Sequence, residues 1–471
     1  MVKTFRYASG FQGVISPCTL TGYTPAPVTE DWLNADGTVR VVQLNSGPVA
    51  QTMIAKNGAM LNPGAPGSSG QGFTSRSMKN GNIGPYSAVA DLGANLPVAF
   101  AEGEEGSIVV TTFDEKGDDK GTGPFTQRDI ITVVSAANSP PVGAFRPAPA
   151  AISKASTHTI SDIIDLATLP ALPMPGRPSF LVLVGNLRWD TVAEFGNGAA
   201  QWKAQAPNNV SNLWKARGLG PDTANATLFL CSDAPVAEKL EVAKVLCQRA
   251  IDLKERLDVM IAEGQTDWGG IQGAIGLGGV NQGQEKLCLL VGGTLFNDAA
   301  MIALGQLSHF AEDGSTMVVT QSKIDNPVSP PGNQGGGFAE YIQEDLDAPE
   351  WTQANGFKQN AGNRLRSDSY RADNAKARVV ASLAIQLWPA LYNNYPAGTR
   401  DLFLDYSDRL MERDFFKLGD SDPSGQNVFQ FARTLGGTKA IPGWALTAWD
   451  NYRANVDPLI HGQTAIWDWP V

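Results

Sequence analysis

Histidine and cysteine are scarce in this sequence: three of its 471 residues are histidine and four are cysteine. No two cysteines form a Cys-x-x-Cys pair, so the sequence predicts no zinc site and we expect neither a metal nor a cofactor. Cys231 and Cys247 lie among apolar residues, as reduced and buried thiols do. This favours a reducing compartment over a secreted, disulfide-bonded protein.

Long apolar runs and an excess of basic residues are also missing. No stretch approaches the roughly 20 apolar residues of a membrane span, and residues 1–10 lack the apolar core of a signal peptide. Asp and Glu number 47 against 36 Lys and Arg, a net charge of -11. Specific nucleic-acid readers need a basic face. We expect no sequence-specific nucleic-acid binding and no membrane binding, and a location in the cytoplasm or in a virion assembled there.

Glycine and proline are abundant, with 50 and 30 residues. Residues 1–138 form a β-rich region, in which 38–44, 107–113 and 129–135 have the β-branched composition of strands. The last two predict a hairpin. Residues 62–73 are too rich in glycine for a packed core and predict an extended arm.

A proline-rich linker at 139–149 leads to a predicted central α/β domain, residues 150–325. Four runs in this domain predict strands: 179–184, 226–231, 286–291 and 316–320. Helices are expected over 159–169 and, capped by Asp298, over 299–311.

The most regular pattern in the chain is a long amphipathic helix in the same domain. Apolar residues recur in steps of three and four from Val236 to Ile261, after a Ser232-Asp233 cap and Pro235. We expect a helix about 40 Å long at ~1.5 Å per residue. Asp252 precedes Arg256 by four residues, which predicts an ion pair on its outer face. The central α/β layer should be built around this helix.

A second linker at 326–337 precedes a mostly helical C-terminal domain, residues 338–471. Helices are expected at 374–388, 400–416 and 426–435, and from Pro442 onward. The fold class is therefore mixed α+β and α/β: a β-rich region with an extended arm, a central α/β layer and a helical C-terminal region.

Cys231, Ser232 and Asp233 are the candidate catalytic residues. A nucleophile between a strand and a helix gains an anion site from the helix N-terminal amides, and a thiol there has a lowered pKa. The structural interpretation is a cysteine ending a strand and a polar helix cap. It is favoured because the Gly-x-Ser-x-Gly motif is missing.

Asp114, Asp118 and Asp119 lie close together in the predicted hairpin loop and are candidate calcium ligands. The spacing of an EF-hand and its final glutamate are missing, which favours solvated turn carboxylates. The glycine run 269–279 lacks the Gly-Lys-Ser/Thr of a phosphate-binding loop.

Four tryptophans are candidate assembly residues: Trp444, Trp449, Trp467 and Trp469. Such a group belongs to a core or anchors a protein–protein contact. Residues 465–471 are strongly apolar for a free end, so we expect them to be buried in their own domain or in a neighbour.

These observations predict a structural protein whose partners are copies of itself, such as a viral or phage capsid, shell or tail component. The alternative is a cytosolic hydrolase or lyase that uses Cys231, Ser232 and Asp233. Few reactive side chains, an extended arm and an apolar C-terminal segment favour the first hypothesis, and so favour a protein that is not an enzyme.

Overall fold

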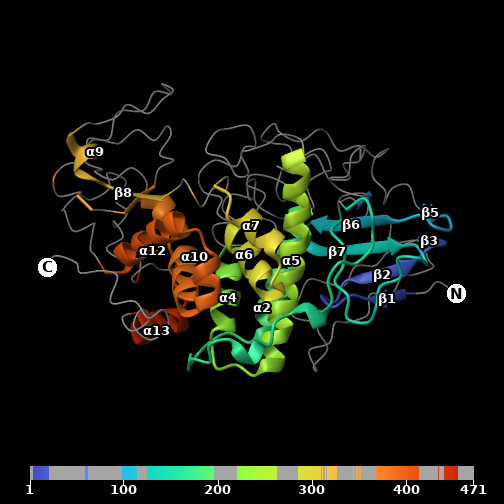
Figure 1. The fold of residues 1–471 in the computed structure, drawn as a ribbon, viewed down its shortest axis with the longest axis horizontal. Helices are drawn as coiled ribbons and strands as arrows, with labels where there is room; N and C mark the ends of the chain where they lie inside the picture. The colour runs from blue at the N-terminus through green and yellow to red at the C-terminus, as the bar shows by residue number, and fades with distance from the viewer. Residues whose placement is uncertain are drawn as a thin grey trace.

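The computed structural model describes residues 4–20, 59–61, 98–113, 125–149, 151–195, 220–262, 285–308, 316–325, 349–351, 368–412 and 440–453, with the single positions 310, 313, 343, 346, 347 and 433. Most strands gather at one end of the molecule, while helices fill its centre and its other end, where the short strand β8 (Thr316–Val318) also lies (Figure 1). The long helix α5 (Val236–Ala262) lies between the two groups. The fold is broadly α+β, with small sheets and a predominance of helix.

The main sheet has the strand order β1, β2, β7, β6, β4. Its strands are β1 (Thr4–Arg6), β2 (Gln12–Ile15), β4 (Ala59–Leu61), β6 (Gly106–Phe113) and β7 (Phe125–Val134). The predicted hairpin is confirmed, because β6 and β7 pair antiparallel along their length. Residues 130–134 of β7 are all buried, so this strand is covered on both faces. A smaller sheet pairs β3 (Cys18–Leu20) with β5 (Val98–Phe100). The expected strand at 38–44 and the arm at 62–73 lie outside the described residues.

Three of the predicted strands in the central region are helices, and those predictions were wrong. Residues 179–184 fall in α2 (Phe180–Phe195), 226–231 in α4 (Gly220–Leu230) and 286–291 in α6 (Glu285–Phe296). All twelve residues of α6 are buried. A helix that is buried all round has no polar stripe, so its sequence resembles a buried strand. Across the part of the chain that the structure describes, none of the helices has the length and apolarity needed to cross a membrane.

The other helices and turns of this region follow the sequence more closely. The cap at Asp298 is confirmed: its carboxylate accepts hydrogen bonds from the amides of Ala300 and Met301, at 2.8 and 3.0 Å, and begins α7 (Ala299–Gly305). The helix expected at 159–169 is instead two short 3-10 turns, η4 (Ile160–Asp162) and η5 (Leu166–Thr168). The strand expected at 316–320 is β8 (Thr316–Val318), which pairs with β9 (Pro349–Trp351) and precedes α9 (Gln321–Asp325).

The described part of the C-terminal region is mostly helical, in agreement with the helices expected at 374–388 and 400–416. Its helices are α10 (Asp368–Leu387), α11 (Pro389–Asn394), α12 (Ala397–Glu412) and α13 (Gly443–Tyr452). The prolines act as expected, because Pro389 opens α11 directly after α10 and Pro442 caps α13. Of the helix expected at 426–435, only position 433 is described.

One hydrophobic core runs through the helical part of the molecule. It joins Phe145 to Leu228 of α4, Leu290 of α6, Leu383 of α10 and Trp449 of α13. The second half of the predicted linker, residues 144–149, is buried. This segment therefore packs against the helices as it leaves the sheet.

Candidate functional site

Cys231, Ser232 and Asp233 form the turn between α4 and α5. Cys231 is fully buried, and burial raises the pKa of its thiol to about 12. Ser232 is also buried, and its hydroxyl donates to the carbonyl of Phe229 at 2.6 Å. Asp233 is exposed and pairs with Arg177 at 2.7 Å. The thiol therefore has neither the access nor the charge that a nucleophile needs.

This turn instead holds a proline-rich segment, residues 169–178. The amide of Leu172 donates to the carbonyl of Cys231 at 3.1 Å, and the amide of Asp233 donates to the carbonyl of Leu172 at 2.9 Å. Lys239, from the first turn of α5, donates to the carbonyl of Pro170 at 2.8 Å. The candidate catalytic residues thus position a neighbouring segment.

Of the remaining candidate residues, two tryptophans lie in the part of the chain that the structure describes. Trp444 and Trp449 are 8% and 2% exposed and belong to the core of α13, so they are not surface anchors. The other candidates lie outside the described residues: Asp114, Asp118, Asp119, Trp467 and Trp469. Within the described ranges, no group of three or more His, Cys, Asp or Glu side chains is placed to hold a metal ion.

His158 has a structural setting. Its imidazole stacks on Phe296, with ring centroids 4.2 Å apart, and its Nε2 lies 3.4 Å from a carboxylate oxygen of Asp298. Because Asp298 caps α7, this contact links the segment after the sheet to the α6–α7 turn.

A buried polar junction between sheet and helices was not predicted from the sequence. Gln248 of α5 accepts from the hydroxyl of Ser9 at 2.7 Å and from the amide of Arg146 at 3.0 Å, and donates to the carbonyl of Arg146 at 2.9 Å. Asp252 pairs with the guanidinium of Arg146, and both side chains are fully buried. Asp252 therefore faces inward, which corrects its expected place on the outer face of the helix; the side chain of Arg256, its expected partner, lies outside what the structure describes.

Two arginines enclose an aromatic ring at this junction. The guanidinium carbons of Arg146 and Arg188 each lie 4.7 Å from the ring centroid of Phe11. Arg188 of α2 also donates to the carbonyl of Gly10 at 3.1 Å. The β1–β2 turn is thereby held by helix α2 and by the segment that follows β7.

Lys154 and Glu105 extend the junction. Lys154 is 1% exposed, its ammonium group donates to the carbonyl of Pro149 at 2.9 Å, and burial lowers its pKa to about 8. Burial disfavours ionisation of Glu105, but hydrogen bonds from Ser135, Lys154 and Asn138 outweigh it and hold the pKa of Glu105 below its usual range. These groups link the end of β7 to the segment after it.

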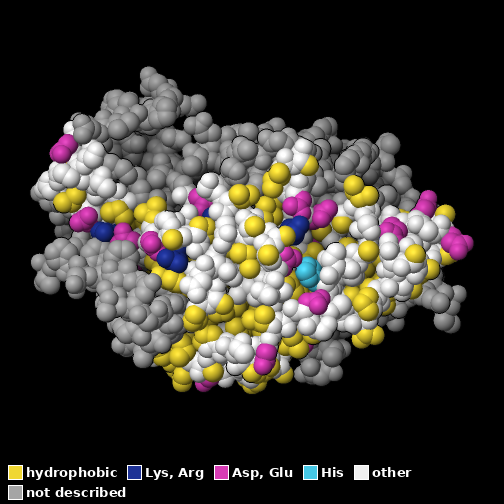
Figure 2. All heavy atoms as spheres, viewed as in Figure 1, with side chains coloured by type: hydrophobic (Ala, Val, Ile, Leu, Met, Phe, Trp, Pro, Cys, Tyr) yellow, Lys and Arg dark blue, Asp and Glu magenta, His cyan; other side chains and the backbone are white. Residues whose placement is uncertain are grey.

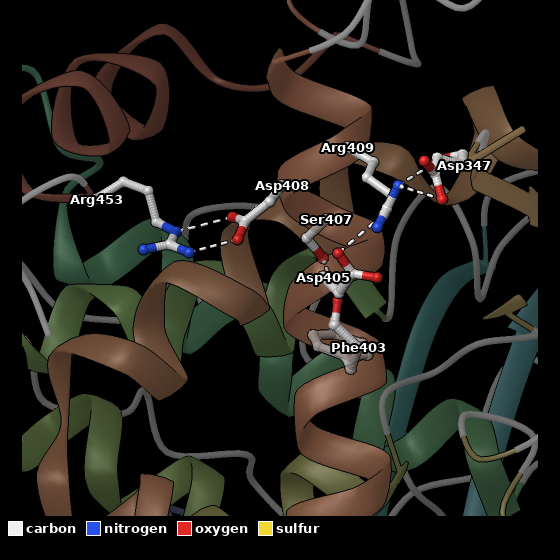
Figure 3. Close-up of polar contacts among 7 residues, drawn as sticks. All are labelled: Asp347, Phe403, Asp405, Ser407, Asp408, Arg409 and Arg453. Atoms are coloured by element: carbon white, nitrogen blue, oxygen red, sulfur yellow. Dashed lines mark hydrogen bonds and ion pairs between the residues drawn. The ribbon is translucent and has the colours of Figure 1, made fainter. Parts of the chain in front are cut away.

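A second charged cluster surrounds α12 (Figure 3). Arg453, just after α13, donates to Asp408 through both arms of its guanidinium, one of them at 2.8 Å. Arg409 donates to Asp405 at 2.9 Å and to the carbonyl of Asp347 at 2.7 Å. Figure 3 shows Arg453 and Asp347 approaching α12 from opposite sides. These pairs fix α12 between its neighbours.

An apolar surface remains exposed at the lower edge of the molecule in Figure 2, over the start of α5. We call it the proline surface. It comprises Pro173, Pro175, Val182, Pro235, Val236 and Ala237, all exposed to solvent. The exposed fractions of Val236 and Val182 are 50% and 40%. Contiguous exposed apolar side chains mark contact sites for other macromolecules.

Comparison with known proteins gives no relative: no family model, no curated protein and no solved structure matches the chain.

Proposed function

We propose that the chain is a structural protein that assembles with copies of itself, as a shell or tail component of a viral or phage particle. The observation that carries this proposal is the proline surface, where prolines and valines face solvent on a rigid support. Apolar surfaces of this kind are buried in protein–protein contacts.

The ion pairs between segments far apart in the sequence support the same function. Arg146 with Asp252, Lys286 with Asp313 and Arg453 with Asp408 join segments far apart in the sequence. In these pairs the charges connect elements of the fold. The alternative, a hydrolase or lyase using Cys231, is less well supported because its thiol is buried and protonated.

Light scattering and negative-stain microscopy of the purified full chain test the proposal. We expect particles whose size rises with protein concentration and which appear as closed shells or tubes. A monodisperse monomer at high concentration would contradict it. A hydrolytic activity that is lost in Asp233→Asn without loss of fold would favour the alternative.

A further inference from the structure

We infer that the proline surface of one copy binds residues 465–471 of a second copy. This inference rests on the proposed self-assembly and names the contact that would produce it.

The surface is held in one shape before anything binds to it. Gly176 turns the segment with a φ of +78°, and a Cβ at this position would lie 3.8 Å from the Cβ of Trp444. Arg177 pairs with Asp233, and Lys239 bonds the carbonyl of Pro170. A preformed surface loses little conformational entropy on binding, so its apolar area contributes efficiently to affinity.

The chemistry of the two segments is complementary. Pro173 and Pro175 both present exposed rings to solvent, and Pro175 stands in a turn closed by a hydrogen bond from the amide of Arg177 to the carbonyl of Met174, at 3.4 Å. Exposed proline rings are apolar surfaces on which aromatic side chains pack. Trp467 and Trp469 supply two such side chains within the apolar residues 465–471.

The chain leaves its last described helix at the edge of the proline surface. The hydroxyl of Tyr452, at the end of α13, donates to the carbonyl of Pro173 at 2.6 Å. Twelve residues lead from Arg453 to Ala465, which span up to ~40 Å when extended. That reach lets residues 465–471 extend away from their own copy, and exchange of a segment between identical chains is a low-cost route to oligomers.

The first test introduces a charge into the surface. Val236→Asp places a carboxylate in the first turn of α5, where the helix dipole tolerates it. The control is Val142→Asp, because Val142 is fully exposed but lies outside the surface. We expect Val236→Asp to weaken assembly at least tenfold in sedimentation, with an unchanged circular dichroism spectrum, and Val142→Asp to assemble like the wild type. Equal assembly of both variants would overturn the inference.

The second test identifies the occupant. A Val236→Cys chain is mixed with a Val471→Cys chain of different mass, which keeps both tryptophans, and oxidised gently. We expect a disulfide-linked heterodimer, and none from Val142→Cys mixed with Val471→Cys. The four native cysteines are buried and do not compete.

The remaining outcomes distinguish this inference from the proposed function. A crosslink formed only within a chain carrying both substitutions would show that the segment binds its own copy, and would overturn the inference. Loss of assembly in Val236→Asp without any crosslink to position 471 would also overturn it, while leaving self-assembly supported. A wild-type chain that never assembles would overturn both.

Discussion

Asp252 faces Arg146 inside the junction between sheet and helices, where both side chains are fully buried. Removing one member of a buried ion pair leaves the other charge uncompensated and costs about 3–5 kcal/mol. We predict that Asp252→Asn lowers the free energy of unfolding by about this amount, measured by urea denaturation of the folded chain.

The matched control is Asp233→Asn, which removes a carboxylate from the partly exposed pair with Arg177. Such surface pairs contribute ~0–1 kcal/mol, so this variant should unfold near the wild-type midpoint. Equal losses of stability in the two variants would mean that the buried pair has no special role at the junction.

The buried amine of Lys154 should make the free energy of unfolding depend on pH. Burial lowers its pKa to about 8 in the folded chain, whereas an unfolded lysine titrates near ~10.4. Between these values the unfolded chain binds a proton that the folded chain does not, so the free energy of unfolding should rise with pH. The rise is at most ~1.4 kcal/mol per pH unit, and it vanishes below about pH 8, where both states are protonated.

Comparison with Lys154→Met isolates this effect. Other groups that titrate at high pH, such as Tyr7, whose pKa burial raises, are common to both chains and cancel in the difference. In denaturation series at pH 7, 8, 9 and 10, we expect the wild type to gain stability relative to the variant only above about pH 8. A difference that stays constant across the series would contradict the assignment.

Among the elements, α5 and α6 pack unusually closely. A Cβ added at Gly292 of α6 would lie 2.1 Å from the Cβ of Ala250 on α5, far inside van der Waals contact. Gly292→Ala should therefore force the helices apart and lower the free energy of unfolding by about 1–3 kcal/mol, measured by denaturant titration.

Gly185→Ala is its control. Gly185 lies inside α2, and a Cβ there meets nothing within 4 Å. The same substitution should then raise stability by about 0.5–1 kcal/mol, because alanine is the better helix former. Changes of the same sign in both variants would show that the close contact of α5 with α6 does not limit stability.

The elements that could be predicted from the sequence are those whose two faces differ. Helix α5 alternates polar and apolar residues with helical period, and the β6–β7 hairpin has β-branched strands around a turn-rich loop. Helix α6 gives no such signal because every residue in it is buried, and α4 has the same difficulty over 226–230. For short apolar runs, periodicity does not distinguish helix from strand.

The candidate sites also show that a sequence pattern reveals local motifs but not contacts between distant residues. The motif at Cys231, Ser232 and Asp233 is local, so it was visible, but burial makes it a structural turn. The junction of Ser9, Arg146, Gln248 and Asp252 includes a hydrogen bond between residues 239 positions apart, and each residue looks ordinary in its own stretch. The recurrence of apolar residues every three and four positions placed Asp252 on a helix. Only its contact with Arg146 in the folded chain shows which face of that helix it occupies.

For the whole molecule, the distribution of charge matters more than its sum. Among the described residues, eight Lys and Arg side chains are buried against three of Asp and Glu. The exposed surface of the described part is therefore more acidic than the sum of its own charges suggests, in a chain whose formal net charge is -11. Copies of such a chain repel one another at long range, so their contacts must be made by uncharged surfaces such as the proline surface.

Salt should consequently strengthen assembly. Raising NaCl from about 0.1 M to about 1 M shortens the screening length from ~10 Å to ~3 Å and removes most of the repulsion between copies. We predict that the protein concentration needed for assembly, measured by sedimentation velocity, falls in high salt. Particles held together by basic contacts to nucleic acid behave in the opposite way, because salt weakens phosphate binding. Dissociation in high salt would therefore contradict assembly through apolar contacts between acidic copies. Val236→Asp, which damages the apolar contact, should remain dispersed at both salt concentrations.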